Sequence, residues 1–289
     1  MSDALRAAAQ QLIDRQGREL AKAVRWLELD LAGLDPKLRW PVAVVGEGQP
    51  VLLLHGFDSS LLEFRRLAPL LAGRYQLWIP DLFGFGFTPR PKGIGYNPEA
   101  VLQHLLTITE QMPAGPIGLI GASMGGSVAV VLARALQDTQ PHRIEKLLLL
   151  APAGLTGKPM PLPPLLDRLG ASFLGLPAVR RGLCRQAFAD PDAAVGPAEE
   201  EIASLHLSTP GWAAALACFA RSGGFAGVGA PLPAAPIHVL WGAQDRILRA
   251  PQKRAAEALL GDRLQLVEGC GHLPHLDQPE LVASTWMAR

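Results

Sequence analysis

With 289 residues, of which 49% are hydrophobic and 18% charged, the chain is long and apolar enough to bury the core of one large domain, which excludes an intrinsically disordered protein. Its formal net charge is +1, and no basic block occurs. Nothing in the composition therefore points to nucleic acid or to an anionic membrane as a partner.

The three cysteines, Cys184, Cys218 and Cys270, are odd in number and far apart, so we expect neither a disulfide framework nor a zinc site. No basic segment followed by an apolar run opens the chain, and no apolar run approaches the ~20 residues of a membrane span. We therefore expect a cytoplasmic protein without a signal peptide or an integral membrane segment.

The first 36 residues predict a helical extension. Apolar residues recur every three or four positions over residues 4–28, which is typical of one amphipathic helix, and Gly17 could divide it. We expect this helix to pack on the domain. A contact within a homodimer or with a membrane surface is an alternative.

From Leu38 onward the pattern changes to short, continuous apolar runs, which are typical of strands buried on both faces of a mostly parallel sheet. The predicted strands cover residues 42–45, 51–54, 76–79, 117–120, 147–150, 237–241 and 264–267. Helical segments are expected between them at 61–71, 99–111, 125–137 and 252–260. This alternation indicates an α/β fold with helices flanking a central sheet.

The alternation is interrupted over residues 153–235. Proline-rich segments (K-P-M-P-L-P-P and A-P-L-P-A-A-P) border this stretch, and its interior is rich in Ala, Leu and Gly. Such borders around a helical block indicate an inserted cap over a core formed by residues 37–152 and 236–289.

The chemistry is carried by Gly121-Ala122-Ser123-Met124-Gly125, which fits the pattern G-x-S-x-G. A predicted strand, I-G-L-I, enters the motif, and a predicted helix, G-S-V-A-V-V-L-A-R-A-L, leaves it. A strand–turn–helix of this kind exposes the serine on a sharp turn at the edge of the sheet. We therefore predict that Ser123 is a nucleophile.

A serine nucleophile needs a base, and the base needs an orienting acid. His272, in a glycine-rich turn after the last predicted strand, is the preferred base over four other histidines, which are His142, His206, His238 and His275. Asp245 follows the predicted strand 237–241, the last but one in the chain. It is the preferred acid, with Asp262 and Glu268 as alternatives. Backbone N–H groups of Met124 and Phe57 are the candidate oxyanion donors. His55 is expected to hold its loop by hydrogen bonds.

Together these segments resemble the α/β-hydrolase superfamily with a helical cap, from about residue 38 to the end. Its loop motif D-x-x-G-x-G-x-S/T is similar to residues 80–88, its oxyanion motif to residues 55–57, and its catalytic-histidine segment to residues 269–280. The resemblance implies a triad of Ser123, Asp245 and His272. Haloalkane dehalogenases and epoxide hydrolases of this fold carry an aspartate at the nucleophile elbow, the strand–turn–helix that holds Ser123 here, so Ser123 argues against both.

The resemblance extends to carboxylesterases and to carbon–carbon hydrolases of ring-cleavage products, and the run H-G-F-D-S-S-L-L-E-F-R-R (55–66) also looks like cyanobacterial and plastid hydrolases, some acting on chlorophyll phytyl esters. Peroxidase-like relatives usually carry a triad as well. We expect an esterase for apolar, short-to-medium acyl substrates, without cofactor or metal. Leu155, Trp212 and Phe219 are candidate pocket residues.

Two different functions stay open. A carbon–carbon hydrolase of meta-cleavage products would need a cation for the substrate carboxylate, which Arg181, Arg185 or Arg221 could supply. A non-catalytic accessory protein of the same fold would usually lack a member of the triad.

Overall fold

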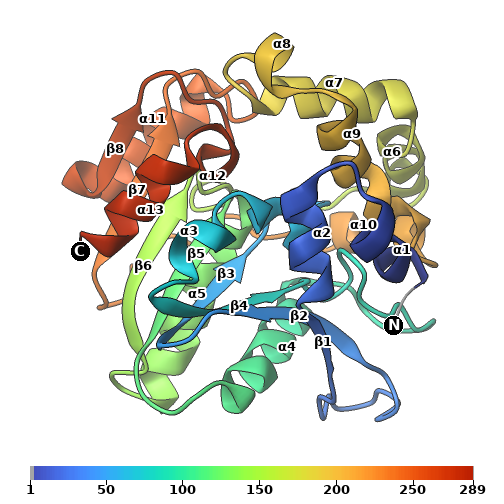
Figure 1. Cartoon of the computed structure of the whole chain (residues 1–289), viewed down its shortest axis with the longest axis horizontal. Coiled ribbons are helices and arrows are strands. Elements are labelled where there is room, and N and C mark those ends of the chain that lie inside the picture. Colours follow the sequence, from blue (N-terminus) through green and yellow to red (C-terminus); the bar gives the residue numbers. More distant parts are fainter. Residues whose placement is uncertain (1–2, 289) are drawn as a thin grey trace.

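A computed structural model describes residues 3–288. Its centre is an eight-stranded sheet in the order β1-β2-β4-β3-β5-β6-β7-β8 (Figure 1). The strands are β1 (Val24–Leu27), β2 (Trp40–Val45), β3 (Gln49–Leu54), β4 (Tyr75–Pro80), β5 (Ile117–Ala122), β6 (Ile144–Leu150), β7 (Ile237–Gly242) and β8 (Leu264–Val267).

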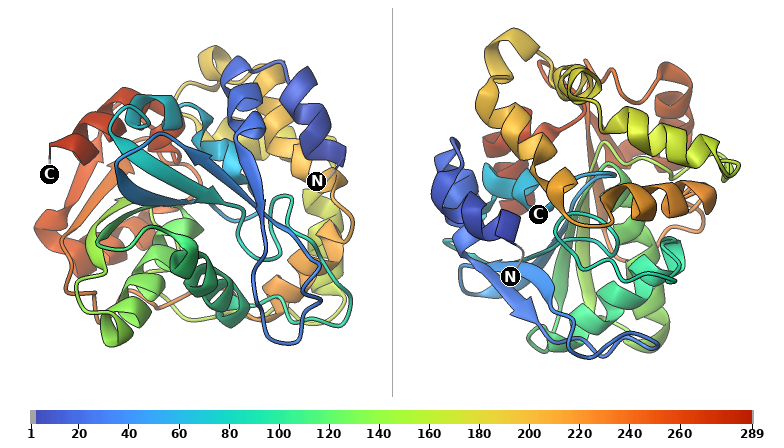
Figure 2. Two further views of the ribbon diagram at one scale, coloured as in Figure 1. Left: turned by 60° about the horizontal axis from the view of Figure 1, so that its bottom comes forward. Right: turned by 90° about the vertical axis from the view of Figure 1, so that its right-hand side faces the viewer.

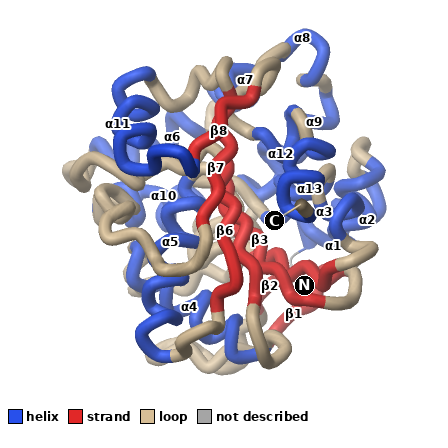
Figure 3. Tube along the Cα trace, turned by 90° about the vertical axis from the view of Figure 1, so that its left-hand side faces the viewer, coloured by secondary structure: helices blue, strands red, loops and turns tan. Residues whose placement is uncertain are grey.

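The sheet is parallel from β4 to β8, whereas β1 and β2 pair antiparallel. All seven predicted strands are confirmed, because continuous apolar runs need cover on both faces. Figure 3 shows the sheet edge-on with helices on either side. The α/β-hydrolase type of fold expected from the motifs is thus present.

One face is covered by α4 (Pro98–Gln111), α5 (Met124–Thr139) and α11 (Ala250–Leu260), and all three were predicted. The other face carries α3 (Ala68–Leu71), α12 (Pro274–Asp277) and α13 (Pro279–Met287). The helix predicted over 61–71 is wrong as a single element. It is divided into a 3₁₀ turn, η1 (Leu61–Arg65), and α3, which has Pro69 in its first turn where a missing N–H is tolerated.

The single N-terminal helix over 4–28 is also wrong. The segment forms α1 (Asp3–Gln11) and α2 (Arg15–Lys22), and residues 24–27 are β1 at the edge of the sheet. The break falls before Asp14, whose side chain caps α2 by accepting from the Gly17 N–H at 2.8 Å. The extension is therefore not wholly helical, because pairing with β2 outweighs the helical period at its end.

The helices within residues 153–235, called the cap here, lie over the carboxyl end of the sheet (Figures 1 and 2). They are α6 (Leu166–Leu174), α7 (Pro177–Ala187), α8 (Pro191–Ala194), α9 (Pro197–Leu205), η2 (His206–Ser208) and α10 (Trp212–Arg221). The last residues of this range return beside α5 to the start of β7, and the Ala234 N–H donates to Gln137 Oε1 at 2.8 Å. Within residues 3–288 no single helix has the length and apolarity to cross a membrane. The bent pair Pro197–Ser208 and Trp212–Arg221, meeting at 85°, reaches that length and composition only when both parts are counted together.

One core side chain makes stability depend on pH. His104 of α4 is fully buried beside Trp40 and Phe83, and neither of its ring nitrogens has a hydrogen-bond partner among the described residues. Burial lowers the pKa of His104 to about 3 from 6.5. The unfolded chain therefore binds this proton at higher pH than the folded chain does.

We expect neutral His104 to make its full contribution to the free energy of unfolding above pH 6.5. As the pH falls toward 3, this contribution should decrease by up to about 1.4 kcal/mol per pH unit. In urea titrations across this range, His104→Phe should unfold with a shallower pH dependence than the parent. His142→Asn, at an exposed turn with φ of 73°, is the control. An identical slope in His104→Phe and the parent would contradict the prediction.

Candidate active site

Ser123 lies on a sharp turn between β5 and α5, with a φ of 50° and ψ of −120°. The residues two positions before and after it must be glycine, since a Cβ on Gly125 would lie 2.0 Å from the Leu54 carbonyl oxygen and one on Gly121 would lie 2.3 Å from the Gly125 oxygen. A non-glycine residue at positive φ is uncommon and indicates a turn held by its surroundings. The turn thus presents the Ser123 hydroxyl above the carboxyl end of the sheet.

The structure brings the three predicted triad residues together. The Ser123 Oγ lies 2.9 Å from His272 Nε2, and His272 Nδ1 lies 2.9 Å from Asp245 Oδ2. The backbone of His272 is fixed to the cap, because its N–H donates to the Ala187 carbonyl at 2.7 Å. The three residues follow β5, β7 and β8 in the chain.

Asp245 is held as a carboxylate. Its Oδ1 accepts the N–H groups of Ile247 and Leu248 at 2.8 and 3.0 Å. Burial by itself would raise the pKa of Asp245, but the hydrogen bond and charge of His272 and the two backbone donors lower the pKa below its usual value. An ionised Asp245 accepts a hydrogen bond from the His272 Nδ1–H, which leaves Nε2 unprotonated and able to accept a hydrogen bond from the Ser123 hydroxyl.

The competing candidates lie elsewhere. His142 is exposed on a turn, His238 is buried in β7, and His206 contacts Asp58. Asp262 belongs to the short η3 turn (Gly261–Arg263), and Glu268 accepts from the Gln244 side chain at 3.1 Å. The His272 ring bonds Ser123 and Asp245 instead of either alternative acid.

His55 has the loop-holding hydrogen bonds that were expected. Its Nε2 accepts the Leu82 N–H at 3.0 Å, so the ring proton is on Nδ1, which donates to the Gly56 carbonyl at 2.8 Å. Burial lowers the pKa of His55 to about 4, and the ring stays neutral near pH 7. His55 thereby ties the loop after β3 to the loop after β4.

The predicted oxyanion donors flank Ser123. Met124 is the first residue of α5, and the first N–H groups of a helix lack partners within the helix. The loop carrying Phe57 passes close by, because a Cβ on Gly56 would lie 3.3 Å from the Ser123 Cβ. Backbone donors from a helix start and a neighbouring loop are thus available around the nucleophile.

Sequence reasoning missed the role of Asp58, which directly follows Phe57 and has a φ of 50°. Three cap residues converge on its carboxylate: Arg180 Nη1 lies at 2.6 Å, Trp212 Nε1 at 2.7 Å and His206 Nε2 at 3.1 Å. Burial would raise the pKa of Asp58, but the hydrogen bond from His206 and the charge of Arg180 keep it lowered. The cap is thus anchored to the loop that holds a candidate oxyanion donor.

A second buried pair lies behind the histidine loop. His275 Nε2 is 3.0 Å from Glu63 Oε1, and Glu63 Oε2 accepts the Gly56 N–H at 3.4 Å. The pKa of Glu63 is lowered to about 2 because contacts with His275 and His55 outweigh its burial. No spacing signal links residues 63 and 275, so only the fold could reveal this contact.

Two cavities share Phe57, and one of them is lined by triad residues. One, of about 260 Å³, is lined by Ser123 and His272 together with cap residues such as Leu174, Leu183 and Arg180. The other, of about 300 Å³, lies against Met124 and is lined by Met160, Leu162, Phe219 and Phe225, among others. Both are mostly apolar and lie between the cap and the core.

Of the three predicted pocket residues, Phe219 lines the second cavity. The other two, Leu155 and Trp212, line neither of these cavities. Leu155 is 3% exposed and packs into the core, and the indole of Trp212 is turned toward Asp58. Cap sequence alone could not distinguish wall residues from packing residues.

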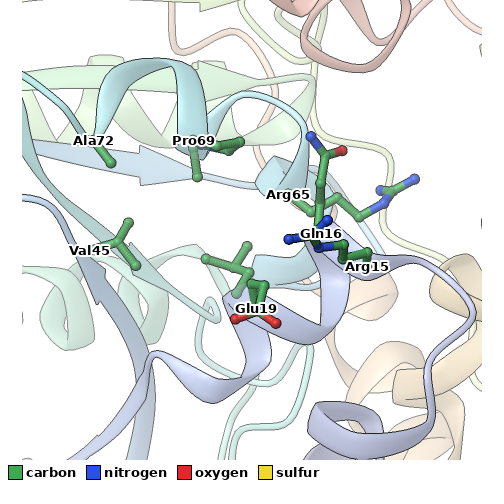
Figure 4. A pocket seen from close by; sticks show the side chains of 9 residues that line it. Arg15, Gln16, Glu19, Val45, Arg65, Pro69 and Ala72 are labelled. Atoms are coloured by element: carbon green, nitrogen blue, oxygen red, sulfur yellow. The ribbon is translucent and has the colours of Figure 1, made fainter.

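A separate hollow of about 460 Å³ lies between α2 and the η1–α3 segment (Figure 4). Figure 4 shows Arg65 and Glu19 among the side chains at its rim. Arg65 is already paired with Asp14 at 2.9 Å and with Glu199 of α9. This hollow shares no lining residue with the cavities at Ser123. Among the described residues no cluster of His, Cys, Asp and Glu could hold a metal ion.

The arrangement at Ser123 can perform nucleophilic acyl transfer. A hydroxyl within hydrogen-bond distance of an imidazole, itself oriented by a carboxylate, can lose its proton as it attacks a carbonyl carbon. Because the hydrogen bonds already exist without substrate, little reorganisation is needed for the first step.

Comparison with known proteins supports the same chemistry class. The chain is 34% identical over 115 residues to a 2-hydroxy-6-oxo-2,4-heptadienoate hydrolase of Pseudomonas putida, a match that covers 39% of the chain and 40% of that protein. It is 29% identical over 248 residues to the alpha/beta hydrolase domain-containing protein VTE7 of Arabidopsis thaliana, covering 83% and 73%.

Among solved structures, a Thermogutta terrifontis esterase superposes with a TM-score of 0.68 at 23% identity, over 92% of this chain and 97% of that one. The epoxide hydrolase CorEH superposes with a TM-score of 0.72 at 20% identity, over 92% and 97%. These identities show the shared fold. A family model for the alpha/beta hydrolase family matches residues 51–285, and the chain therefore belongs to that family.

Proposed function

We propose that this protein is a serine hydrolase that cleaves carboxylic esters with an apolar, short-to-medium acyl group. The observation that carries the proposal is the continuous chain of hydrogen bonds from Asp245 through His272 to Ser123, beside two apolar cavities. Membership of a hydrolase family supports the reaction class.

In the proposed reaction, the Ser123 Oγ attacks the ester carbonyl while His272 Nε2 takes its proton. Asp245 stabilises the imidazolium, and the N–H groups of Met124 and Phe57 bind the oxyanion, each contributing about 3 kcal/mol to lowering the barrier. His272 then protonates the leaving alkoxide. Water, deprotonated by the same ring, cleaves the acyl-enzyme and restores Ser123.

Two cavities that share Phe57, one lined by Ser123 and the other by the adjacent Met124, suit the two sides of an ester. The acyl chain and the alcohol leave the carbonyl carbon in different directions, and each can occupy one cavity. Their combined lining is apolar, with Leu174 and Leu183 on one side and Phe219 and Phe225 on the other. Burial of such groups contributes ~25 cal/mol per Å² of apolar surface, which favours apolar esters.

A carbon–carbon hydrolase of meta-cleavage products is the second candidate, since relatives of that kind match part of the chain. It needs a cation for a carboxylate, but the arginines proposed for this role are engaged elsewhere. Arg181 pairs with Glu200, Arg185 with Asp192 and Arg221 with Asp167. Arg180 does line the cavity at Ser123, yet its charge is opposed by Asp58 at 2.6 Å. Charge pairing therefore favours neutral esters.

A non-catalytic role and an aspartate-dependent hydrolysis have less support. A non-catalytic accessory protein gains nothing from a fully hydrogen-bonded Ser–His–Asp set, and all three residues are present. The elbow carries Ser123, whereas the resemblance assigns an aspartate there to epoxide hydrolases and haloalkane dehalogenases.

The first test replaces the nucleophile. We expect Ser123→Ala to lower kcat on p-nitrophenyl butyrate by at least about 10⁴-fold, because the variant lacks the hydroxyl that attacks the ester carbonyl. Ser208→Ala, which changes an exposed serine of the cap, should keep the parental rate. Full activity of Ser123→Ala on any substrate that the parent cleaves would refute the assignment of the nucleophile.

The second test addresses the substrate class. A panel of p-nitrophenyl esters of increasing acyl length, run beside one ring-cleavage dienoic acid, should give a higher kcat/KM for the short-to-medium esters. Faster turnover of the dienoic acid than of every ester would favour the carbon–carbon hydrolase. Hydrolysis of none of the esters would remove the main support for an esterase.

The third test concerns Asp58. We expect Asp58→Asn to lower kcat on p-nitrophenyl butyrate by about 10- to 100-fold, since a small displacement of the Phe57 N–H is enough to weaken the oxyanion contact. The unopposed charge of Arg180 should at the same time raise relative activity on a p-nitrophenyl ester with a terminal carboxylate.

Asp192→Asn, which removes an exposed carboxylate from the Arg185 pair in the same cap, is the matched control. Because removal of one partner of a buried pair costs roughly 3–5 kcal/mol, the double variant Asp58→Asn/Arg180→Met separates lost stability from lost alignment. An unchanged kcat in folded Asp58→Asn protein would show that the cap contact does not align the loop.

A further inference from the structure

The outer face of the cap exposes several large apolar side chains. Along α6 and the turn after it, Leu166, Leu169, Phe173 and Leu176 are 50–58% exposed and recur every three or four residues, so they form one stripe. Met160 and Leu162, in the segment leading to α6, are 81% and 40% exposed. These six residues are called the apolar stripe below.

The stripe is a feature of the folded cap. The opposite face of α6 is buried through Asp167 and Ala171 and packs on α10, so α6 is oriented with its leucines outward. Figure 1 shows α6 at the outer side of the cap. Contiguous exposed apolar surface on a folded protein marks a surface that contacts another phase or molecule.

The stripe is continuous with the candidate active site. Met160 and Leu162 are exposed members of the stripe, and both also line the 300 Å³ cavity that reaches Met124 and Phe57. A protein partner or a second copy seated on these two residues would cover that cavity. A lipid phase that itself contains the substrate would instead deliver that substrate into the cavity.

The charges around the stripe suit phosphate headgroups. Over residues 157–176 the exposed charged side chains are Lys158 and Arg168, both cationic. The one carboxylate in that segment, Asp167, is buried and pairs with Arg221 at 3.2 Å. An apolar helix face bordered by cations is the arrangement by which helices lie in the interface of a phospholipid layer.

We propose that the apolar stripe docks the cap on a phospholipid surface, from which an apolar ester enters the cavity between Met160 and Met124. Binding is driven by insertion of the leucines and Phe173, and Lys158 and Arg168 contact lipid phosphates. The net charge of +1 does not indicate this surface, because the proposed affinity for lipid comes from the placement of apolar side chains.

The test is flotation of the full-length protein with vesicles of phosphatidylcholine containing one-fifth phosphatidylglycerol. We expect the parent to float with the vesicles, and Leu169→Gln/Phe173→Gln to lose at least about tenfold in vesicle affinity, since the affinity of interfacial helices scales with inserted apolar area. The matched control is Ile13→Gln/Met287→Gln, which replaces two exposed apolar residues outside the cap. It should float like the parent.

Equal flotation of the stripe variant and the parent would overturn the proposal, as would failure of the parent to float. A parent that is dimeric in light scattering and a stripe variant that is monomeric, with no vesicle binding by either, would assign the surface to a second copy and overturn it too.

The source of the substrate rests on the proposed esterase function, but vesicle binding does not. Flotation needs no catalysis and should be retained by Ser123→Ala. On soluble p-nitrophenyl butyrate the stripe variant should keep the parental kcat, whereas on a long-chain ester dispersed in the vesicles its rate should fall with the lost affinity. If the parent hydrolyses the soluble ester but does not float, the docking proposal fails. If it floats but hydrolyses no ester, the esterase proposal fails.

Discussion

Parallel strand pairing is the constraint on which the candidate site depends. The ladder continues past the strands themselves, since the Ser123 N–H donates to the Leu150 carbonyl at 2.8 Å and the Ala243 N–H to the Val267 carbonyl at 2.9 Å. Parallel strands deliver their carboxyl ends to one edge, so loops far apart in sequence meet there. A shift of one residue in β5 would turn the serine away from His272.

The elbow itself adds a local constraint. Close approach of Gly125 to the Leu54 carbonyl lets α5 start directly beneath Ser123, and the positive φ of Ser123 is held by this packing. Rigid placement of the hydroxyl allows His272 to meet it at 2.9 Å before any substrate is bound. The strain of one residue is thus compensated by the sheet and helix around it.

The cap and core are joined through buried charges. Asp58 receives Arg180, His206 and Trp212 from the cap, and Glu199 of α9 pairs with Arg65 and Arg66 beneath it. Charges that are buried together must stay paired, because an unpaired one costs several kcal/mol. Cap position and loop position are therefore coupled, while the outer face of the cap remains apolar and free to meet another surface.

The sequence by itself determined the seven core strands, the elbow and the order Ser123, Asp245, His272. These follow from local signals: apolar runs, glycines at a tight turn, and polar residues just after strands. It misassigned residues 24–27, because a helical period there is overruled by pairing with β2. Only the tertiary structure decided which cap residues face the cavity, that Asp58 anchors the cap, and that α6 turns its leucines outward. Those outcomes depend on contacts between distant segments, which no local pattern encodes.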